Sequence, residues 1–263
     1  MTISAIILTR NEELNIEDCL SSVAFADEKL VVDSGSIDQT VTLAEKLGAR
    51  VVTRAFADFA SQRNFAMAEA QGDWILFLDA DERVTQALAE EIKEIAQANP
   101  GDVIRMPRNL TKGIEFFEGP CVYAIPRHNF FFGRRLRFSD ARDDAPVRLF
   151  PRAGVRWFQP VHEKIATEFP TRELKSPILH YSTRDLVHYK QKIRDYIPLE
   201  LETMRTKGLR PSLIKALFLP SAKFVQLYFL QLGFLDGLAG FQYAILSAYF
   251  YTFQKYWLYW KQQ

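Results

Sequence analysis

Two carboxylates one residue apart, Asp79 and Asp81, are the residues of this chain with the clearest chemical potential. They end an apolar run at 74–78 whose bulky side chains predict a buried strand. On extended backbone, residues i and i+2 point to the same side, so the two acids would lie together. Mg²⁺ and Mn²⁺ prefer oxygen donors, and such an ion bridges an acid pair and a diphosphate leaving group. The alternative is a solvated acidic turn that caps the next helix.

The first hundred residues alternate between apolar runs and helical patterns, with short connections. We expect strands at 3–8, 30–32, 49–53 and 74–78, and helices at 11–23, 40–47, 59–70 and 85–99, the first of them with Asn11 as a possible N-cap. This alternation predicts an α/β fold with a mostly parallel sheet flanked by helices. We divide the chain into an α/β half at 1–100, a second half of the same domain at 101–184, and a helical region at 185–263.

Polar side chains follow three of the predicted strands, at the points where those strands end. They are Thr9 to Glu12 after the first strand, Asp33 to Asp38 after the second, and Asp79 and Asp81 after the fourth. In a parallel sheet these ends converge along one edge, so one ligand can touch all three. Asp33 would accept a hydrogen bond from a base or a ribose hydroxyl. For Ser36 and Asp38 we favour a structural role, as caps of the helix that begins near Thr40.

Two further predictions concern arginine residues. Arg63, near the start of the third helix, is either a ligand for a nucleotide and its phosphates or an ordinary surface residue. Between residues 105 and 156, ten arginines and one lysine oppose five acids. The planar guanidinium suits bidentate contacts with phosphate or carboxylate, and the alternative is a solvated basic face.

Composition excludes several classes of protein. The formal net charge of +1 gives no global field for nucleic acid. Cys19 and Cys121 form neither a metal-binding spacing nor a disulfide framework, which is typical of a reducing cytoplasm. The N-terminus has no basic segment before its first apolar run, so we interpret it as a strand and not as a signal peptide.

The C-terminal region is strongly apolar. The stretch from Phe224 to Gln254 carries a single charge, Asp236, and is long enough to span a bilayer once. Gly233, Gly237 and Gly240 break it into two shorter pieces, and a charge in lipid would be costly. We therefore favour two helices at a membrane interface, with lysine and arginine facing anionic headgroups. The alternative is a helical pair packed on the core or on a second subunit, which would make a homo-oligomer.

The motifs at 5–12, 31–40, 62–64 and 72–82, which include Gln62-Arg-Asn64 and Asp79-Ala-Asp81, resemble those of family 2 glycosyltransferases of the GT-A fold. More narrowly, Arg148-Leu-Phe150, Val161-His-Glu163 and residues 233–237 resemble the lipopolysaccharide core β-1,4-glucosyltransferase group. The resemblance implies inverting transfer of one sugar from a nucleotide-sugar, such as UDP-glucose or another UDP-hexose, with Mg²⁺ or Mn²⁺. The acceptor would be a lipid-linked saccharide such as lipopolysaccharide core, at the cytoplasmic face of the inner membrane, with the protein peripheral or monotopic.

The resemblance also assigns roles to residues. By motif, Asp33 would contact the base, Asp79 the ribose or the metal, and Asp81 the metal. The further candidates for nucleotide binding are Thr9, Asn11, Glu12 and Arg63. His162 would orient the acceptor, bind phosphate or help hold the metal; the alternative is a structural histidine. Inversion needs a general base opposite the leaving diphosphate; the candidates are Glu163 first, then Asp143 and Asp144. The alternatives are a polyprenyl-phosphate glycosyltransferase and an inactive nucleotide-sugar-binding scaffold. A nucleotidyltransferase would need a glycine-rich phosphate loop after the first strand, and residues 9–13 do not form one.

Overall fold

The structure, a computed structural model, describes residues 1–97, 104–105, 116–117, 120–158 and 164–262. The chain forms two compact units. Unit 1 comprises Met1–Arg127 and Ala145–Leu179, and unit 2 comprises His128–Asp144 and His180–Gln263.

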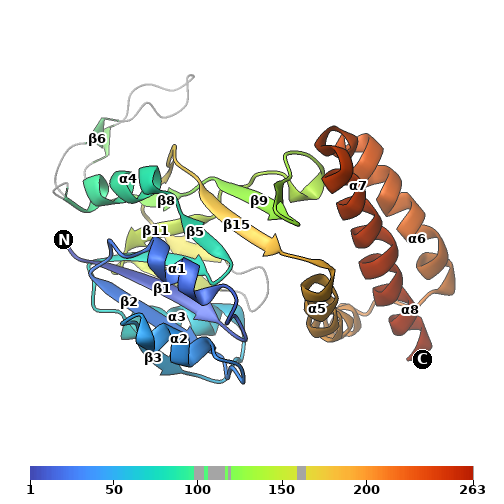
Figure 1. The fold of residues 1–263 in the computed structure, drawn as a ribbon, viewed down its shortest axis with the longest axis horizontal. Coiled ribbons are helices and arrows are strands. Elements are labelled where there is room, and N and C mark those ends of the chain that lie inside the picture. The colour runs from blue at the N-terminus through green and yellow to red at the C-terminus, as the bar shows by residue number, and fades with distance from the viewer. Residues whose placement is uncertain (98–103, 106–115, 118–119, 159–163, 263) are drawn as a thin grey trace. The chain divides into compact units, whose positions relative to one another are not determined.

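A seven-stranded sheet in the order β14-β8-β11-β4-β1-β2-β3 is the centre of unit 1 (Figure 1). Its strands are β1 (Ile3–Thr9), β2 (Glu28–Asp33), β3 (Arg50–Thr53), β4 (Trp74–Asp79), β8 (Val122–Ala124), β11 (Val147–Pro151) and β14 (Thr171–Glu173). Strands β1 to β4 are parallel, whereas β11 runs antiparallel to both β4 and β8. The predicted α/β class with a large sheet flanked by helices is therefore confirmed.

Helices and a hairpin cover the two faces of this sheet. On one face lie α1 (Ile16–Ser22), α2 (Thr40–Lys46) and α4 (Gln86–Gln97). On the other lie α3 (Phe59–Glu69) and the hairpin of β12 (Val155–Phe158) and β13 (Lys164–Thr167). Two short strands, β6 (Ile104–Arg105) and β7 (Phe116–Phe117), pair separately.

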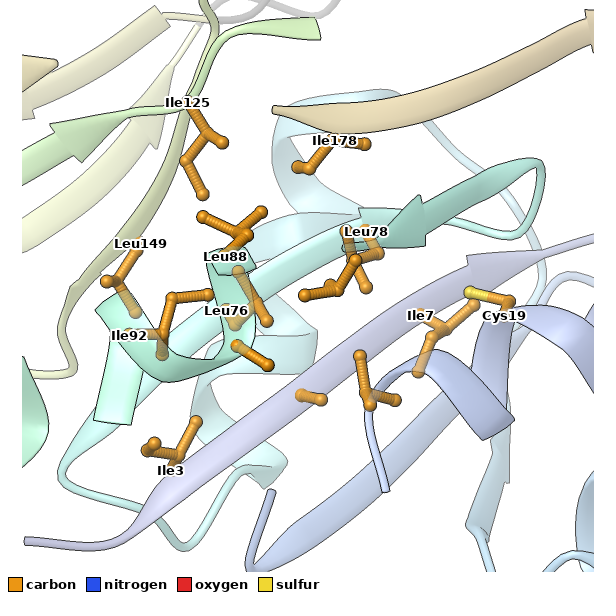
Figure 2. Packing of buried hydrophobic residues seen from close by; sticks show 14 of the residues in the cluster. Ile3, Ile7, Cys19, Leu76, Leu78, Leu88, Ile92, Ile125, Leu149 and Ile178 are labelled. Atoms are coloured by element: carbon orange, nitrogen blue, oxygen red, sulfur yellow. The ribbon is translucent and has the colours of Figure 1, made fainter. Parts of the chain in front are cut away.

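The strands are apolar on both faces because both faces are covered. Ile7 of β1 and Leu78 of β4 face the helices α1 and α4, where Cys19 and Leu88 pack with them (Figure 2). Phe77, one residue earlier in β4, packs on the opposite face against the cluster that contains α3. The run of bulky residues thus predicted the buried strand correctly.

The first helix differs from its prediction. It begins at Ile16 and not at Asn11, and its N-cap residue is Asn15. Asn11 is not the cap, because its φ of 56° places it in the left-handed region. Asparagine tolerates this conformation better than most residues do, and here it serves a loop. A cap that the sequence reading missed is Asp58, which accepts a hydrogen bond from Ser61 N at the start of α3 (2.8 Å).

Unit 2 is mostly helical. Its strands are β9 (Arg127–Phe131), β10 (Arg134–Arg135) and the end of β15 (Ile178–Thr183), with the short η1 (Ser139–Ala141) beside them in sequence. Its helices are α5 (Leu186–Thr206), α6 (Leu213–Val225), η2 (Gln226–Leu230), η3 (Gly233–Asp236), α7 (Gly237–Ile245), η4 (Leu246–Thr252) and α8 (Phe253–Lys261). Phe131, Tyr189, Ile193 and Tyr259 belong to its buried core.

Two long helical stretches dominate unit 2 (Figure 1, orange and red). The first runs through α6 and η2, and the second through α7, η4 and α8. They contact each other along their lengths. The break between them falls at η3, as the glycines predicted. Gly240 allows a close approach there, because a Cβ at this position would lie 1.9 Å from the carbonyl oxygen of Gly233.

Asp236 is not an isolated charge at this break. Its carboxylate accepts hydrogen bonds from the backbone N–H groups of Arg137 and Phe138, each at 3.0 Å. Both partners belong to unit 2, so the acid links η3 to the segment before η1. By length and composition, one helix among the described residues, Leu213–Leu230, is apolar enough to cross a membrane, with a mean hydropathy of 1.4.

Candidate active site

The carboxyl ends of β1, β2 and β4 lie side by side in the sheet. Thr9 at the end of β1 is the register partner of Asp33 at the end of β2, and Leu8 is the partner of Asp79. The convergence predicted from the sequence is therefore observed. A single ligand at this edge can contact all three strand ends.

The acid pair does not lie on one extended strand, as we had expected. Asp79 is the last residue of β4, the chain turns at Ala80 and Asp81, and β5 (Glu82–Val84) begins immediately afterwards. The alternation of sides that holds in a strand therefore does not apply between the two acids. Asp81 is 8% exposed, so this is not a solvated acidic turn.

A buried arginine, Arg148 of β11, holds the first acid. Its Nη2 donates to Asp79 Oδ2 at 2.7 Å and to Glu82 Oε1 at 2.6 Å. Glu82 is fully buried, and its other oxygen, Oε2, accepts a hydrogen bond from Asp79 N at 3.0 Å. Arg127 also donates to Glu82 Oε1 at 3.2 Å. Buried charges require such partners, and here the pairing fixes the position of Asp79 at the end of β4.

Arg63 approaches the same carboxylate from α3. Its guanidinium lies 5.1 Å from the ring centroid of Phe77 and 4.8 Å from that of Trp157, with Nη2 3.5 Å from Asp79 Oδ1. The residue is only 5% exposed, so its interpretation as a surface residue is wrong. Burial acts to raise the pKa of Asp79, but the charges of Arg148 and Arg63 outweigh it and hold that pKa well below its usual value. Asp79 is therefore a carboxylate at neutral pH.

Asp33 shapes the loop that follows β2. Its Oδ2 accepts hydrogen bonds from Gly35 N and Ser36 N, both at 2.9 Å, and its Oδ1 accepts one from Ser36 Oγ at 2.5 Å. Gly35 has a φ of 87°, which suits glycine at this turn. A carboxylate has about four lone-pair sites, so Asp33 retains capacity for one more donor.

The loops after β1 and β2 are joined by hydrogen bonds. Asn11 N donates to Ser36 Oγ at 2.8 Å, and Ile37 N donates to Asn11 Oδ1 at 2.9 Å. Asp38 Oδ1 accepts from Thr40 N, the first residue of α2, at 3.0 Å. Asp38 therefore has the structural role predicted for it, since it accepts from the first residue of α2, although the N-cap residue of α2 is Gln39. Ser36 does not cap this helix; it bonds Asp33 and Asn11 and, with Asn11, holds the loop.

Glu12 and Arg83 brace the turn that carries Asp81. Asn15 Nδ2 donates to Glu12 Oε2 at 2.6 Å, and Arg83 Nη2 donates to Asn15 Oδ1 at 3.3 Å. Arg83 Nη1 also donates to the carbonyl oxygen of Ala80 at 2.8 Å. Glu12 is thus linked to the turn by Asn15 and Arg83, so in this geometry it helps to hold the turn in position.

Several buried polar atoms around these strand ends have no hydrogen-bond partner among the described residues. They are Thr9 Oγ1, Gln62 Oε1, Trp157 Nε1 and Arg148 Nε. Such atoms are uncommon in protein interiors and call for an explanation, because each costs the free energy of its lost hydration. Thr9 ends β1 and Arg148 holds Asp79, so this edge is the candidate functional site.

The donor set fits a divalent cation only in part. Asp79 and Asp81 supply carboxylate oxygens, the type of ligand that Mg²⁺ and Mn²⁺ prefer. Among the described residues, no group of three metal-binding side chains is found. His162 lies outside the described residues, as does Glu163, the first candidate for the base. Any further ligands would come from water and from the phosphates of a donor.

The two remaining candidates for the base belong to unit 2. Asp143 forms an ion pair with Arg135 and lies 3.8 Å from His128 Nε2. Burial, followed by the charge of Arg135, lowers the pKa of His128. Asp144 is exposed. The structure thus gives Asp143 partners within its own unit.

Glu82 and Arg148 are the residues that the sequence reading missed as parts of the site. A signal for Arg148 was present: it is the one charge between Val147 and Phe150 in an apolar strand. A charge in such a run predicts a buried ion pair, although the sequence does not name its partners. The partners lie 66 and 69 positions away.

Adjacent strand ends, an acid pair whose first member is ionised, and buried arginines are the features of a nucleotide-sugar transferase of the α/β class. The chain belongs to glycosyl transferase family 2, whose model matches residues 4–156, and it is a glycosyltransferase. It is 27% identical to the lipopolysaccharide core biosynthesis glycosyltransferase LpsC of Rhizobium meliloti (strain 1021), over 94% of this chain and 91% of that protein. It is 47% identical to an uncharacterized glycosyltransferase of Rickettsia bellii (strain RML369-C), over 35% of this chain and 32% of that protein, so the match spans about a third of that relative.

Among solved structures, glucosyl-3-phosphoglycerate synthase from Mycobacterium tuberculosis, in complex with Mn²⁺, UDP and glucosyl-3-phosphoglycerate, is 32% identical. The match covers 31% of this chain and 34% of that one, with a TM-score of 0.29. TarS 1–349 of S. aureus is 16% identical over 94% of this chain and 79% of that one, with a TM-score of 0.42.

Proposed function

We propose that this chain is an inverting enzyme that transfers one hexose from a UDP-sugar to a lipid-linked saccharide such as lipopolysaccharide core. The main support for this proposal is the register of the strand ends. Thr9 of β1 is the partner of Asp33 of β2, and Leu8, the residue before Thr9, is the partner of Asp79 of β4. The edge they form is where open α/β sheets bind nucleotides. The unpaired Oγ1 of Thr9 and the remaining acceptor capacity of Asp33 suit the base and ribose.

The site is suited to a departing diphosphate. Asp81 and Asp79 would hold Mg²⁺ or Mn²⁺, which neutralises the charge that develops on the diphosphate as the sugar leaves. Arg63 is already oriented toward the acid pair by the rings beneath it. Arg148 and Arg63 keep Asp79 ionised, and Arg148 with Glu82 holds it in place, so the carboxylate is already positioned before the donor binds.

The transfer also needs a base for the acceptor. In an inverting reaction the acceptor oxygen attacks the anomeric carbon opposite the diphosphate and loses its proton to a carboxylate. We assign this role to Glu163, with Asp143 and Asp144 as the other candidates. Glu163→Gln should keep nucleotide-sugar binding and lose most turnover. Near-normal turnover in that variant would remove Glu163 from the role.

The proposed acceptor class rests on LpsC, which aligns over most of the chain and carries lipopolysaccharide core biosynthesis in its name. A lipid-linked acceptor also agrees with the character of unit 2. Its helical stretch α6–η2 leaves apolar side chains in solvent, including Ile214 (70% exposed), Phe218 (69%) and Leu230 (75%). Exposed apolar surface of this kind marks an interaction site.

Charge favours an anionic bilayer as the partner of this surface. From Thr203 to Gln263 the chain has seven lysines and arginines and one acid, Asp236. That acid is covered by the N–H groups of Arg137 and Phe138. Basic residues near an anionic membrane contribute about 1 kcal/mol each. We therefore propose a peripheral or monotopic protein on the cytoplasmic face of the inner membrane.

Calorimetric titration with UDP, GDP and CDP, each with and without Mn²⁺, tests the donor assignment. We expect metal-dependent binding of UDP, and Asp81→Asn should remove the metal dependence. Binding of none of the three nucleotides would contradict the proposal and favour an inactive scaffold.

Sedimentation with vesicles tests the membrane assignment separately. The protein should bind vesicles that contain anionic lipid more strongly than neutral ones, and less strongly at high salt. Phe218→Gln with Leu230→Gln should weaken this binding. Ile37→Gln, which changes a 93% exposed residue of unit 1, is the control and should leave it unchanged. Equal loss in both would contradict the assignment.

A further inference from the structure

Unit 2 contains a cavity of about 220 Å³ that is lined entirely by residues of this unit. Three elements form its wall: the end of β15, the first half of α5, and the stretch from α7 into η4. The lining residues are Ser182, Thr183, Tyr189, Lys192, Ile193, Tyr196, Tyr243, Ser247 and Tyr251.

The lining is rich in hydroxyl groups. Seven of the nine residues carry one, and four of these are tyrosines. Tyrosine offers an apolar ring and a polar tip in one side chain, so it can pack against a ring and also donate a hydrogen bond. Burial raises the pKa of Tyr189 and of Tyr251, so both are neutral phenols at neutral pH, with Ser247 and Glu200 as their respective hydrogen-bond partners in unit 2.

The residue types that line the cavity argue against a phosphate and against an acyl chain as its ligand. Lys192 is the only cation in the lining, and its Nζ already donates to the carbonyl oxygen of Ser182 at 3.2 Å. A phosphate site would require arginine or several backbone N–H groups. An acyl chain would require aliphatic walls, whereas Ile193 is the only aliphatic residue among the nine.

The backbone beside the cavity is irregular. Ser247 and Tyr251 belong to η4, a π-helical stretch of seven residues. π-helical turns are rare and occur often at functional sites, because the extra residue re-aims the side chains of that turn. Here the stretch places two of the lining residues on the cavity.

We infer that this cavity binds one sugar ring of the acceptor saccharide, an inference that rests on the proposed function. Its volume holds roughly seven waters at ~30 Å³ each, which suits a monosaccharide ring. Ser182 Oγ donates to the carbonyl oxygen of Phe130 at 3.1 Å and Tyr243 OH donates to Asp140 Oδ1 at 2.7 Å, so these hydroxyls offer their oxygens as acceptors for the hydroxyl groups of a sugar. The tyrosine rings of the lining offer apolar surface for the sugar ring. Tyr196, which is 46% exposed, lies at the open side of the cavity, and Tyr189, which is 9% exposed, lies inside.

Saturation-transfer NMR with methyl α-D-glucopyranoside, methyl α-D-galactopyranoside and methyl α-D-mannopyranoside tests this inference on the full-length protein. At least one glycoside should receive saturation and give a measurable Kd. Tyr251→Ala and Tyr196→Ala should each weaken that Kd by about tenfold or more, as loss of an aromatic anchor does. Because Tyr196 is half exposed, its variant should fold even if the other does not.

Tyr249→Ala is the matched control. It removes a tyrosine from the same π-helical stretch that is 47% exposed and does not line the cavity. Its glycoside binding should equal that of the unchanged protein. Saturation of no glycoside, or equal loss in all three variants, would overturn the inference. UDP titration of the same samples reports on the proposed function separately, since the cavity variants should leave nucleotide binding unchanged.

Discussion

The two units of this protein differ in which of their side chains are buried and which are exposed. In unit 1, charged residues such as Glu82 and Arg148 are buried and paired, and large apolar side chains fill both faces of the sheet. In unit 2, charged residues become scarce after residue 211, and apolar residues of that part, such as Phe218 and Leu230, are exposed. Buried ion pairs fix the position of a reacting group, whereas exposed apolar side chains mark a surface that binds another molecule. The comparison thus assigns the chemical step to unit 1 and the binding of a partner to unit 2 in the proposed function.

The largest effect should follow from removal of the second acid. Asp81→Ala should lower metal-dependent transfer about a thousandfold, the loss expected when several kcal/mol of charge stabilisation disappear. Initial rates with a range of Mn²⁺ concentrations measure it. The control is Glu90→Ala, which removes a carboxylate whose side chain is 61% exposed and which pairs with Lys93 within α4, and it should leave the rates unchanged. Retained activity in the Asp81 variant would place the metal elsewhere.

Removal of the buried cation should unfold unit 1 more readily. Arg148→Met leaves the fully buried Glu82 with Arg127 as its remaining arginine partner, at 3.2 Å, and loss of one partner of a buried ion pair costs about 3–5 kcal/mol. Urea denaturation measures the free energy of unfolding. The matched control is Lys93→Met, which breaks the surface pair with Glu90 and should cost less than about 1 kcal/mol. Equal losses would show that burial does not set the strength of these pairs.

The acid of unit 2 should have an intermediate effect. Asp236→Ala leaves the N–H groups of Arg137 and Phe138 without their acceptor, which costs about 1–3 kcal/mol. Asp236→Asn retains one acceptor oxygen and should cost less. Thermal denaturation of both variants ranks them. If the alanine variant were as stable as the unchanged protein, the carboxylate would not hold this segment.

The smallest effect should come from pH. Because the pKa of Asp79 is lower in the folded chain than its ordinary value of 3.8, its contribution to stability is present above that value and is lost as the pH falls through the folded pKa. The unfolding free energies of the unchanged protein and of Asp79→Asn should therefore differ more at about pH 7 than at about pH 3. The Asp79 side chain is 38% exposed, so water screens its ion pairs and limits this difference. An equal difference at both pH values would contradict the lowered pKa.

Much of unit 1 could be predicted because its signals are local. The run 74–78 indicated a buried strand, and strand ends such as Thr9 and Asp33 converge in any parallel sheet. The break at Gly233 in unit 2 was visible for the same reason, since glycine weakens a helix locally, although Gly240, which was also expected to break it, lies inside α7.

The parts that could not be predicted depend on contacts between distant residues. Antiparallel β11 lies between β8 and β4, and no pattern in its own residues specifies that place. Arg63 was ambiguous because burial by Phe77 and Trp157 appears only after the sheet and the hairpin assemble. Asn11 was misread as a cap because its role depends on Ile37, 26 residues later.

The reactivity of the Cys19 thiol can be used to measure the rate at which this site opens. This thiol is fully buried under the turn of the acid pair, with Sγ 3.7 Å from the carbonyl oxygen of Asp79, and burial raises its pKa. A neutral, enclosed thiol does not react with a maleimide, so alkylation of Cys19 in a Cys121→Ala background waits for α1 to separate from β4. The rate of Cys19 labelling therefore measures how often α1 and β4 separate by local unfolding. A bound nucleotide should lower this rate.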